Sequence, residues 1–133
     1  MTLAPETTTL RVQLRLAEPN DTAGTAATAG TAAADDWFAV CDLSVLLPGR
    51  GVAALLPDGR QVAVFLDRTG RMYAIDNRDP FSGAAVLSRG LTGSHQGRPF
   101  VASPLLKQRF DLASGVCLDD ESVRVTTYEV RAH

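Results

Sequence analysis

Two short proline-containing loops carry the residue types whose spacing raises a question of chemistry. The first reads RDPFSG (residues 78–83) and the second reads SPLL (residues 103–106). Each follows a strand-like run, and a glycine-containing turn comes after it. Proline and glycine fix an unusual backbone path of the kind that holds a bound group. Yet neither loop contains a cysteine or a histidine, the side chains that metal sites most often use.

Short apolar runs separated by turn residues must position these loops. The runs lie at residues 37–43, 51–56, 60–67, 72–76, 98–103, 108–113 and 122–130. Glycine and proline punctuate them, and no segment shows a convincing apolar period of about 3.6 residues. The sequence therefore predicts an all-β domain over residues 37–133, an antiparallel sandwich or barrel that presents two proline loops.

The first 36 residues are predicted to be a flexible, Ala/Thr-rich N-terminal segment. Residues 19–36 are almost wholly Ala, Thr, Gly and Asp, which offer too little bulky apolar surface to offset the entropy of ordering. Residues 10–18, LRVQLRLAE, alternate apolar and polar side chains with the period of a strand. Two outcomes stay open for them: an edge strand, or disorder with the rest of the tail.

The bulk composition narrows the class of partner. The formal net charge is −2 and the isoelectric point is about 5.6, whereas a nucleic-acid binder normally carries a basic face. No apolar run approaches the roughly 20 residues of a membrane helix, and the start lacks the pattern of a secretory signal. We expect a cytoplasmic protein with no nucleic-acid or membrane partner.

Compared position by position, the two loops resemble those of a Rieske domain, which holds a [2Fe–2S] cluster with Cys-x-His and Cys-x-x-His. DPFSG stands where that family has CPHxG, and SPLL stands where it has CPxH. FDLASG (110–115) keeps the family's FDLxTG with serine for threonine. The scaffold residues match over about residues 37–131. The four ligand positions do not, because they read Asp79, Phe81, Ser103 and Leu106.

These four residues are not a cluster-binding set, so we expect neither metal nor cofactor in this chain. Phe81 and Leu106 have no donor atom, and we expect them to be buried and to fill the space between the loops. Asp79 and Ser103 are expected to accept backbone N–H groups. A weak mononuclear site of Asp79 with His95 is one further interpretation, and a solvent-exposed acid and histidine is the ordinary one.

Two longer stretches narrow the resemblance. LPGRGVAALLPDGRQVAVF (47–65) and YAIDNRDPFSGA (73–84) are similar to the small subunit of bacterial NAD(P)H-dependent assimilatory nitrite reductase. That resemblance implies an accessory subunit without catalytic residues of its own, in a complex that reduces nitrite to ammonium in nitrate assimilation. It also implies a large partner subunit that carries FAD, an iron–sulfur cluster and sirohaem.

An interaction or regulatory module of another redox complex is the alternative function. A third reading, an electron-transfer ferredoxin, is disfavoured by the missing ligands. In the first two readings the paired loops either dock on the partner or simply close the β fold. The docking hypothesis predicts a charged rim around an apolar centre, formed by Arg78, Arg89, Lys107 and Arg109.

Overall fold

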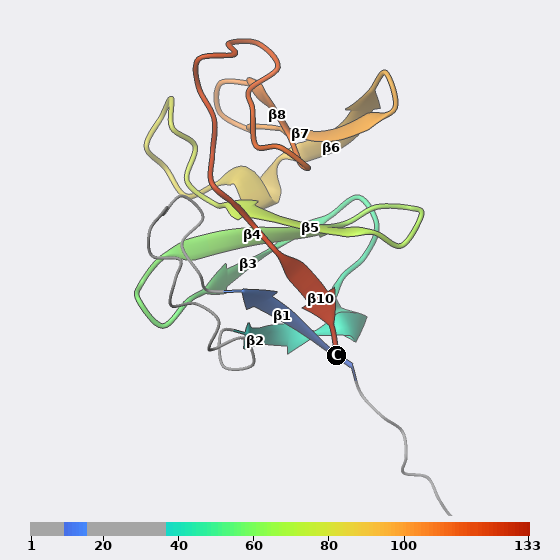
Figure 1. The fold of residues 1–133 in the computed structure, drawn as a ribbon. Coiled ribbons are helices and arrows are strands. Elements are labelled where there is room, and N and C mark those ends of the chain that lie inside the picture. The colour runs from blue at the N-terminus through green and yellow to red at the C-terminus, as the bar shows by residue number, and fades with distance from the viewer. Residues whose placement is uncertain (1–9, 16–36) are drawn as a thin grey trace, which may run out of the picture.

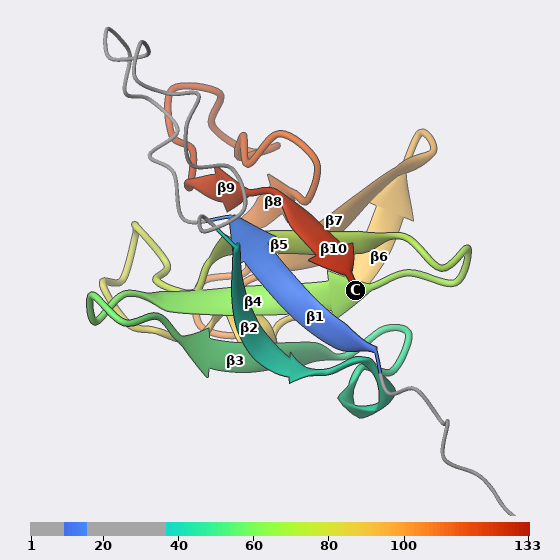
Figure 2. The same cartoon turned by 60° about the horizontal axis from the view of Figure 1, so that its bottom comes forward.

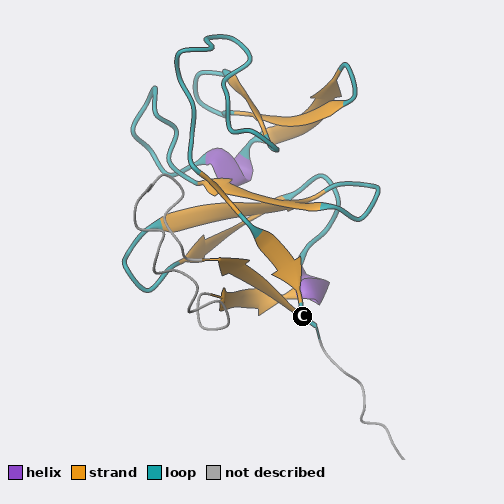
Figure 3. Cartoon of the chain, in the orientation of Figure 1, coloured by secondary structure: helices purple, strands orange, loops and turns teal. Residues whose placement is uncertain are grey.

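Three antiparallel sheets make up the part of the chain that this computed structural model describes, residues 10–15 and 37–133 (Figures 1 and 3). The first sheet has the order β10 (Val130–Ala132), β1 (Arg11–Arg15), β2 (Trp37–Asp42). The second has the order β3 (Gly51–Leu55), β4 (Gln61–Leu66), β5 (Met72–Asp76), β9 (Thr127–Tyr128). The third has the order β6 (Leu91–His95), β7 (Arg98–Ala102), β8 (Arg109–Asp111). The predicted all-β class is confirmed.

Two short 3-10 helices complete the described elements, η3 (Leu43–Val45) and η4 (Leu87–Arg89). Among the described residues, no helix is long and apolar enough to cross a membrane.

Strand β4 separates two apolar cores. Successive side chains of a strand point to opposite faces, so Val62 and Val64 join the core shared with the first sheet, while Ala63 and Phe65 join the core shared with the third. All four side chains are buried. The continuous apolar run VAVF is thus a strand covered on both faces, and Figure 1 shows the second sheet lying between the other two.

The N-terminal residues contain an integral strand. β1 pairs with β2 on one side and with β10 on the other (Figure 2), and the side chains of Val12 and Leu14 are fully buried. Of the two outcomes left open for residues 10–18, a strand is found for Arg11–Arg15, but it is the central strand of its sheet and not an edge strand. The prediction that residues 1–36 are all flexible is therefore wrong for this strand. The Ala/Thr-rich stretch 19–36 lies outside the described residues.

Two further elements differ from the sequence prediction. Leu91–His95 forms β6, although LTGSH shows no apolar alternation, because it pairs along β7 at the outside of the third sheet. The single strand expected at 122–130 is broken instead. Tyr128 pairs with β5 of the second sheet and Val130 pairs with β1 of the first, so the chain changes sheets at this point.

Candidate functional site

Three loops share one hydrogen-bond pattern. The side-chain oxygen of the starting residue accepts a hydrogen bond from the backbone N–H two positions later. The backbone carbonyl of the starting residue accepts one from the N–H four positions later. Its own N–H donates to the carbonyl five positions later, and these bonds measure 2.7–3.2 Å. Such turns explain why Asp or Ser begins each loop. The first loop (79–84), second loop (103–108) and third loop (111–116) start at Asp79, Ser103 and Asp111.

The residue four positions after each start has a left-handed backbone. Gly83 has φ of 79° and Gly115 has φ of 80°. In the third loop a Cβ on Gly115 would lie only 2.2 Å from the carbonyl oxygen of Val125, so no other residue fits there. In the second loop the same position is Lys107, with φ of 68°. A non-glycine residue in this region is strained by about 1 kcal/mol or more.

A buried side-chain hydrogen bond joins the first and second loops. The Ser103 hydroxyl donates to Asp79 Oδ2 over 2.6 Å, and Asp79 and Ser103 are 0% and 1% exposed. Asp79 Oδ1 accepts the Phe81 N–H at 2.9 Å, and Ser103 Oγ accepts the Leu105 N–H at 3.2 Å. We call the pair Asp79–Ser103 the loop clasp. It ties together, through protein side chains, two loops whose starts are 24 residues apart.

The gap-filling prediction is met only in part by Phe81 and is wrong for Leu106. Phe81 is half-buried and packs against the core beneath the loops, with its ring centroid 6.1 Å from that of Phe110. Leu106 is 50% exposed. Leu106 thus lies half in solvent, and Phe81 alone of the pair packs on the core.

The structure does not support the minor interpretation of Asp79 with His95 as a mononuclear metal site. Asp79 is buried in the clasp, whereas His95 is exposed at the end of β6. Within residues 10–15 and 37–133, no group of three or more Cys, His, Asp or Glu side chains is placed to hold a metal ion. The expectation of a solvent-exposed acid at position 79 is wrong, because the carboxylate forms the clasp.

The four predicted rim residues differ in their contacts. Arg78, Arg89 and Lys107 are exposed, and none forms an ion pair with a described residue. Arg109 instead binds Asp119 through Nε at 3.2 Å and Nη2 at 2.9 Å, and these hydrogen bonds lower the pKa of Asp119. Arg89 lines a groove to which no residue of the first or second loop contributes.

Comparison with known proteins shows the family to which this chain belongs. The family model described as "Rieske-like [2Fe-2S] domain" matches residues 36–133. The nitrite reductase (NADH) small subunit of Salmonella typhimurium is 49% identical over 96 residues, which cover 71% of this chain and 88% of that protein. This chain belongs to the nitrite reductase small subunits with a Rieske-like domain.

Solved structures agree with this assignment. The solution NMR structure of the nitrite reductase [NAD(P)H] small subunit from Erwinia carotovora is 49% identical, with a TM-score of 0.57. The aligned region covers 68% of this chain and 69% of the Erwinia chain.

One relative of this small subunit has a different length. The nitrite reductase [NAD(P)H] large subunit of Klebsiella oxytoca is 44% identical over 96 residues, which cover 71% of this chain but only 10% of that protein. A stretch similar to this small subunit is therefore one part of a much longer polypeptide in Klebsiella.

The residues of this small subunit do not fit the cluster that the family description names. Such a cluster needs four converging thiolate or imidazole donors. Phe81 and Leu106 offer none, and the oxygens of Asp79 and Ser103 already bond each other and the backbone. A cluster here would have to break the buried clasp and would still lack two ligands.

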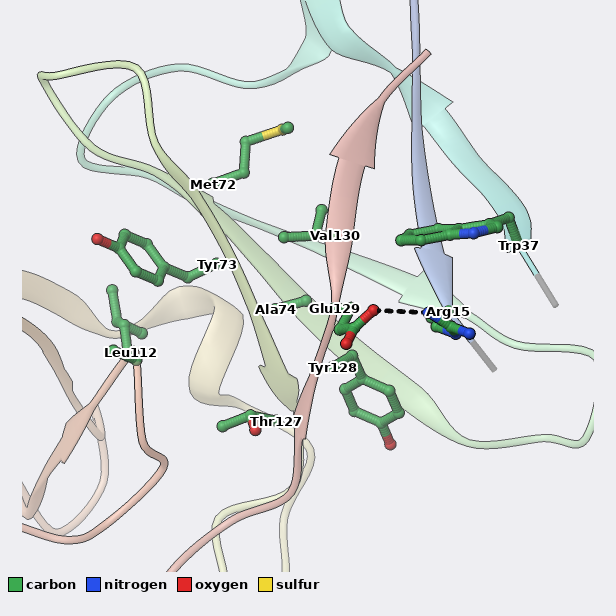
Figure 4. Close-up of a pocket in the computed structure, with 11 residues that line it drawn as sticks. Arg15, Trp37, Met72, Tyr73, Ala74, Leu112, Thr127, Tyr128, Glu129 and Val130 are labelled. Atoms are coloured by element: carbon green, nitrogen blue, oxygen red, sulfur yellow. Dashed lines mark hydrogen bonds and ion pairs between the residues drawn. The ribbon is translucent and has the colours of Figure 1, made fainter. Parts of the chain in front are cut away.

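A hollow of about 870 Å³ lies beside β5 and β10 (Figure 4). Arg15 pairs with Glu129 at 3.1 Å, and the guanidinium of Arg131 lies 4.1 Å from the ring centroid of Trp37. The charged groups at its border are thus engaged with described neighbours. Arg15 and Trp37 also flank residues 16–36, which lie outside the described residues, so we assign this hollow no ligand.

Sequence reasoning placed a motif at residues 110–115 but missed the clasp and the hydrogen-bond pattern that the third loop shares with the other two. It assigned Asp79 and Ser103 hydrogen bonds to backbone only, and those bonds are present. A signal was available for the third loop, because Asp111 precedes Gly115 by the same four residues that separate Asp79 from Gly83. No local signal reveals the clasp, since it depends on the two loops meeting in space.

Proposed function

We propose that this chain is the accessory small subunit of an NAD(P)H-dependent nitrite reductase that reduces nitrite to ammonium. FAD, an iron–sulfur cluster and sirohaem belong in this proposal to the large partner subunit, and this chain holds no redox group. The absence of cluster donors at Asp79, Phe81, Ser103 and Leu106 supports that division. The proposal places the complex in the cytoplasm, where NAD(P)H is available as reductant.

The Klebsiella relative carries the argument for the partner. A domain 44% identical to this chain forms 10% of a protein named as the large subunit of nitrite reductase. Domains that share one polypeptide in one organism and are separate chains in another commonly work in one assembly. This observation favours a nitrite reductase over an unrelated redox complex.

The test is reconstitution of the enzyme from separately purified subunits. We expect this chain to co-purify with the large subunit of the same organism and to raise its NAD(P)H-dependent nitrite reduction at least several-fold. After anaerobic incubation with iron and sulfide, the isolated chain should show no visible absorption and no stoichiometric iron. A Rieske-type EPR signal would contradict the assignment of all redox groups to the partner, and failure to associate would contradict the function itself.

A further inference from the structure

A hollow of about 660 Å³ lies between the beginning of β3 and the beginning of β6. Its walls come from two stretches of the chain: residues 45–52, from η3 to the start of β3, and residues 88–92, from η4 to the start of β6. We call this hollow the arginine groove and define it by five of its residues. They are Val45, Leu47, Arg50, Arg89 and Leu91.

Three large apolar side chains are exposed over this one groove. Val45 is 49% exposed, Leu47 is 51% exposed and Leu91 is 69% exposed. A single exposed leucine needs no explanation, but several gathered over a hollow mark an interaction surface. At the tip of the second loop the exposed apolar residues are only two neighbours in sequence, Leu105 and Leu106.

The groove is positively charged in a chain whose formal net charge is −2. Arg50 and Arg89 both line it, both are exposed, and neither forms an ion pair with a described residue. Among residues 10–15 and 37–133, no aspartate or glutamate lines the groove. A guanidinium binds a carboxylate through two parallel hydrogen bonds, and an apolar centre with arginines is the composition of strong protein interfaces.

The groove backbone is held in place by close packing. A Cβ on Gly51 would lie 2.5 Å from the carbonyl oxygen of Ser88, and a Cβ on Gly90 would lie 2.3 Å from that of Ala102. The Thr92 hydroxyl also donates to the Gly49 carbonyl over 3.2 Å. A surface formed in this way pays little ordering entropy when a partner binds.

We propose that the large subunit docks in the arginine groove through an extended segment that carries carboxylates beside apolar side chains. β3 and β6, which border the groove, are the outermost strands of their sheets in the described part of the chain, so an extended segment can lie alongside them. The inference rests on the proposed function. It places the docking surface away from the tip of the two loops. Of the four predicted rim residues, Arg89 alone lines the groove.

The test measures affinity for the immobilised large subunit of the same organism by biolayer interferometry. One variant removes the apolar contacts (Leu47→Ser with Leu91→Ser), and another reverses the charges (Arg50→Glu with Arg89→Glu). We expect each to weaken binding at least tenfold. The loss from charge reversal should be larger at low than at high salt, because salt screens exposed charges.

The second loop supplies the matched control. Leu105→Ser with Leu106→Ser makes the same chemical change at leucines of similar exposure, and Lys107→Glu reverses a charge there. These variants should bind within twofold of wild type, and a tenfold loss confined to them would return the interface to the tip. Thermal melts verify folding. Leu47→Ala and Leu91→Ala replace any serine variant that melts early.

The outcomes separate the inference from the function on which it rests. Wild-type chain that fails to bind the large subunit overturns both. Wild-type binding that neither groove variant weakens overturns the groove alone. Sedimentation equilibrium adds one more arm: a wild-type dimer that Leu47→Ser with Leu91→Ser abolishes would assign the groove to a second copy of this chain, against the proposal.

Discussion

The first and second loops share their backbone hydrogen bonds but differ in where their side chains lie. In the first loop Phe81, two positions after the start, packs on Phe110, and Gly83 takes the left-handed position. In the second loop the corresponding residues are Leu105, which is 52% exposed, and Lys107, which is strained.

This difference shows that loop shape and loop burial have separate causes. The backbone pattern needs only an oxygen acceptor at the start and a left-handed residue four positions later. Burial depends instead on what lies next to each side chain: Phe81 of the first loop packs on the core, whereas Leu105 of the second is exposed. The second loop is fixed at its beginning by the clasp, and its following residues face solvent.

The largest expected effect comes from breaking the clasp that links the two loops. Asp79→Ala and Ser103→Ala should each lower the free energy of unfolding by about 2–4 kcal/mol, because each leaves buried polar groups without partners. In a denaturant-unfolding cycle the double variant should cost at least about 1 kcal/mol less than the sum of the single variants. Ser94→Ala, at an exposed serine of β6, is the control. Additive single effects would mean that the two loops are held independently.

A smaller loss of stability should follow from removing the contact between the first loop and the core. Phe81→Ala removes a half-buried ring and its contact with Phe110, which should cost about 1.5–2.5 kcal/mol, less than for a fully buried phenylalanine. Phe81→Leu should recover most of this loss in the same denaturant melts. A cost below about 0.5 kcal/mol for Phe81→Ala would place the first loop in solvent, as the second is.

The strain at Lys107 predicts a change of the opposite sign. Lys107→Gly gives the second loop the residue that the other two loops have at this position, and should raise stability by about 0.5–1 kcal/mol. Arg68→Gly is the control, because Arg68 is exposed in a turn and lacks a left-handed backbone. It should lower stability slightly. Equal effects of the two changes on the melting temperature would show that the left-handed position carries no strain.

The smallest effect on stability is expected at Leu106, the residue of the second loop that was predicted to fill the gap. Leu106→Ala should change the free energy of unfolding by less than about 0.5 kcal/mol, since the side chain is half in solvent. Leu87→Ala, at a fully buried leucine, should cost about 2–5 kcal/mol and calibrates the measurement. A loss above about 1.5 kcal/mol at Leu106 would mean that both loops are plugged by side chains.

The sequence was informative where structure is decided locally. Apolar runs and glycine turns predicted the β class, and proline, aspartate and glycine marked the loops. It failed where distant segments decide the outcome. Leu106 was expected inside because nothing local shows that Asp79 and Ser103 already join. β6 was missed because LTGSH is exposed and gains its strand conformation from pairing with β7.

The pairing of β1 with β10 brings Arg11 and His133 together. The Arg11 N–H donates to the His133 carbonyl over 3.3 Å, and the His133 N–H donates to the Arg11 carbonyl over 2.9 Å. A longer polypeptide that entered the domain at Arg11 would leave it at His133, on the directly paired neighbouring strand. The domain is therefore suited to transfer as a cassette: it can be spliced into a surface turn of a host protein through short linkers, leaving the host's ends of that turn close together. Gene fusion on either side of this fold thus has a low geometric barrier.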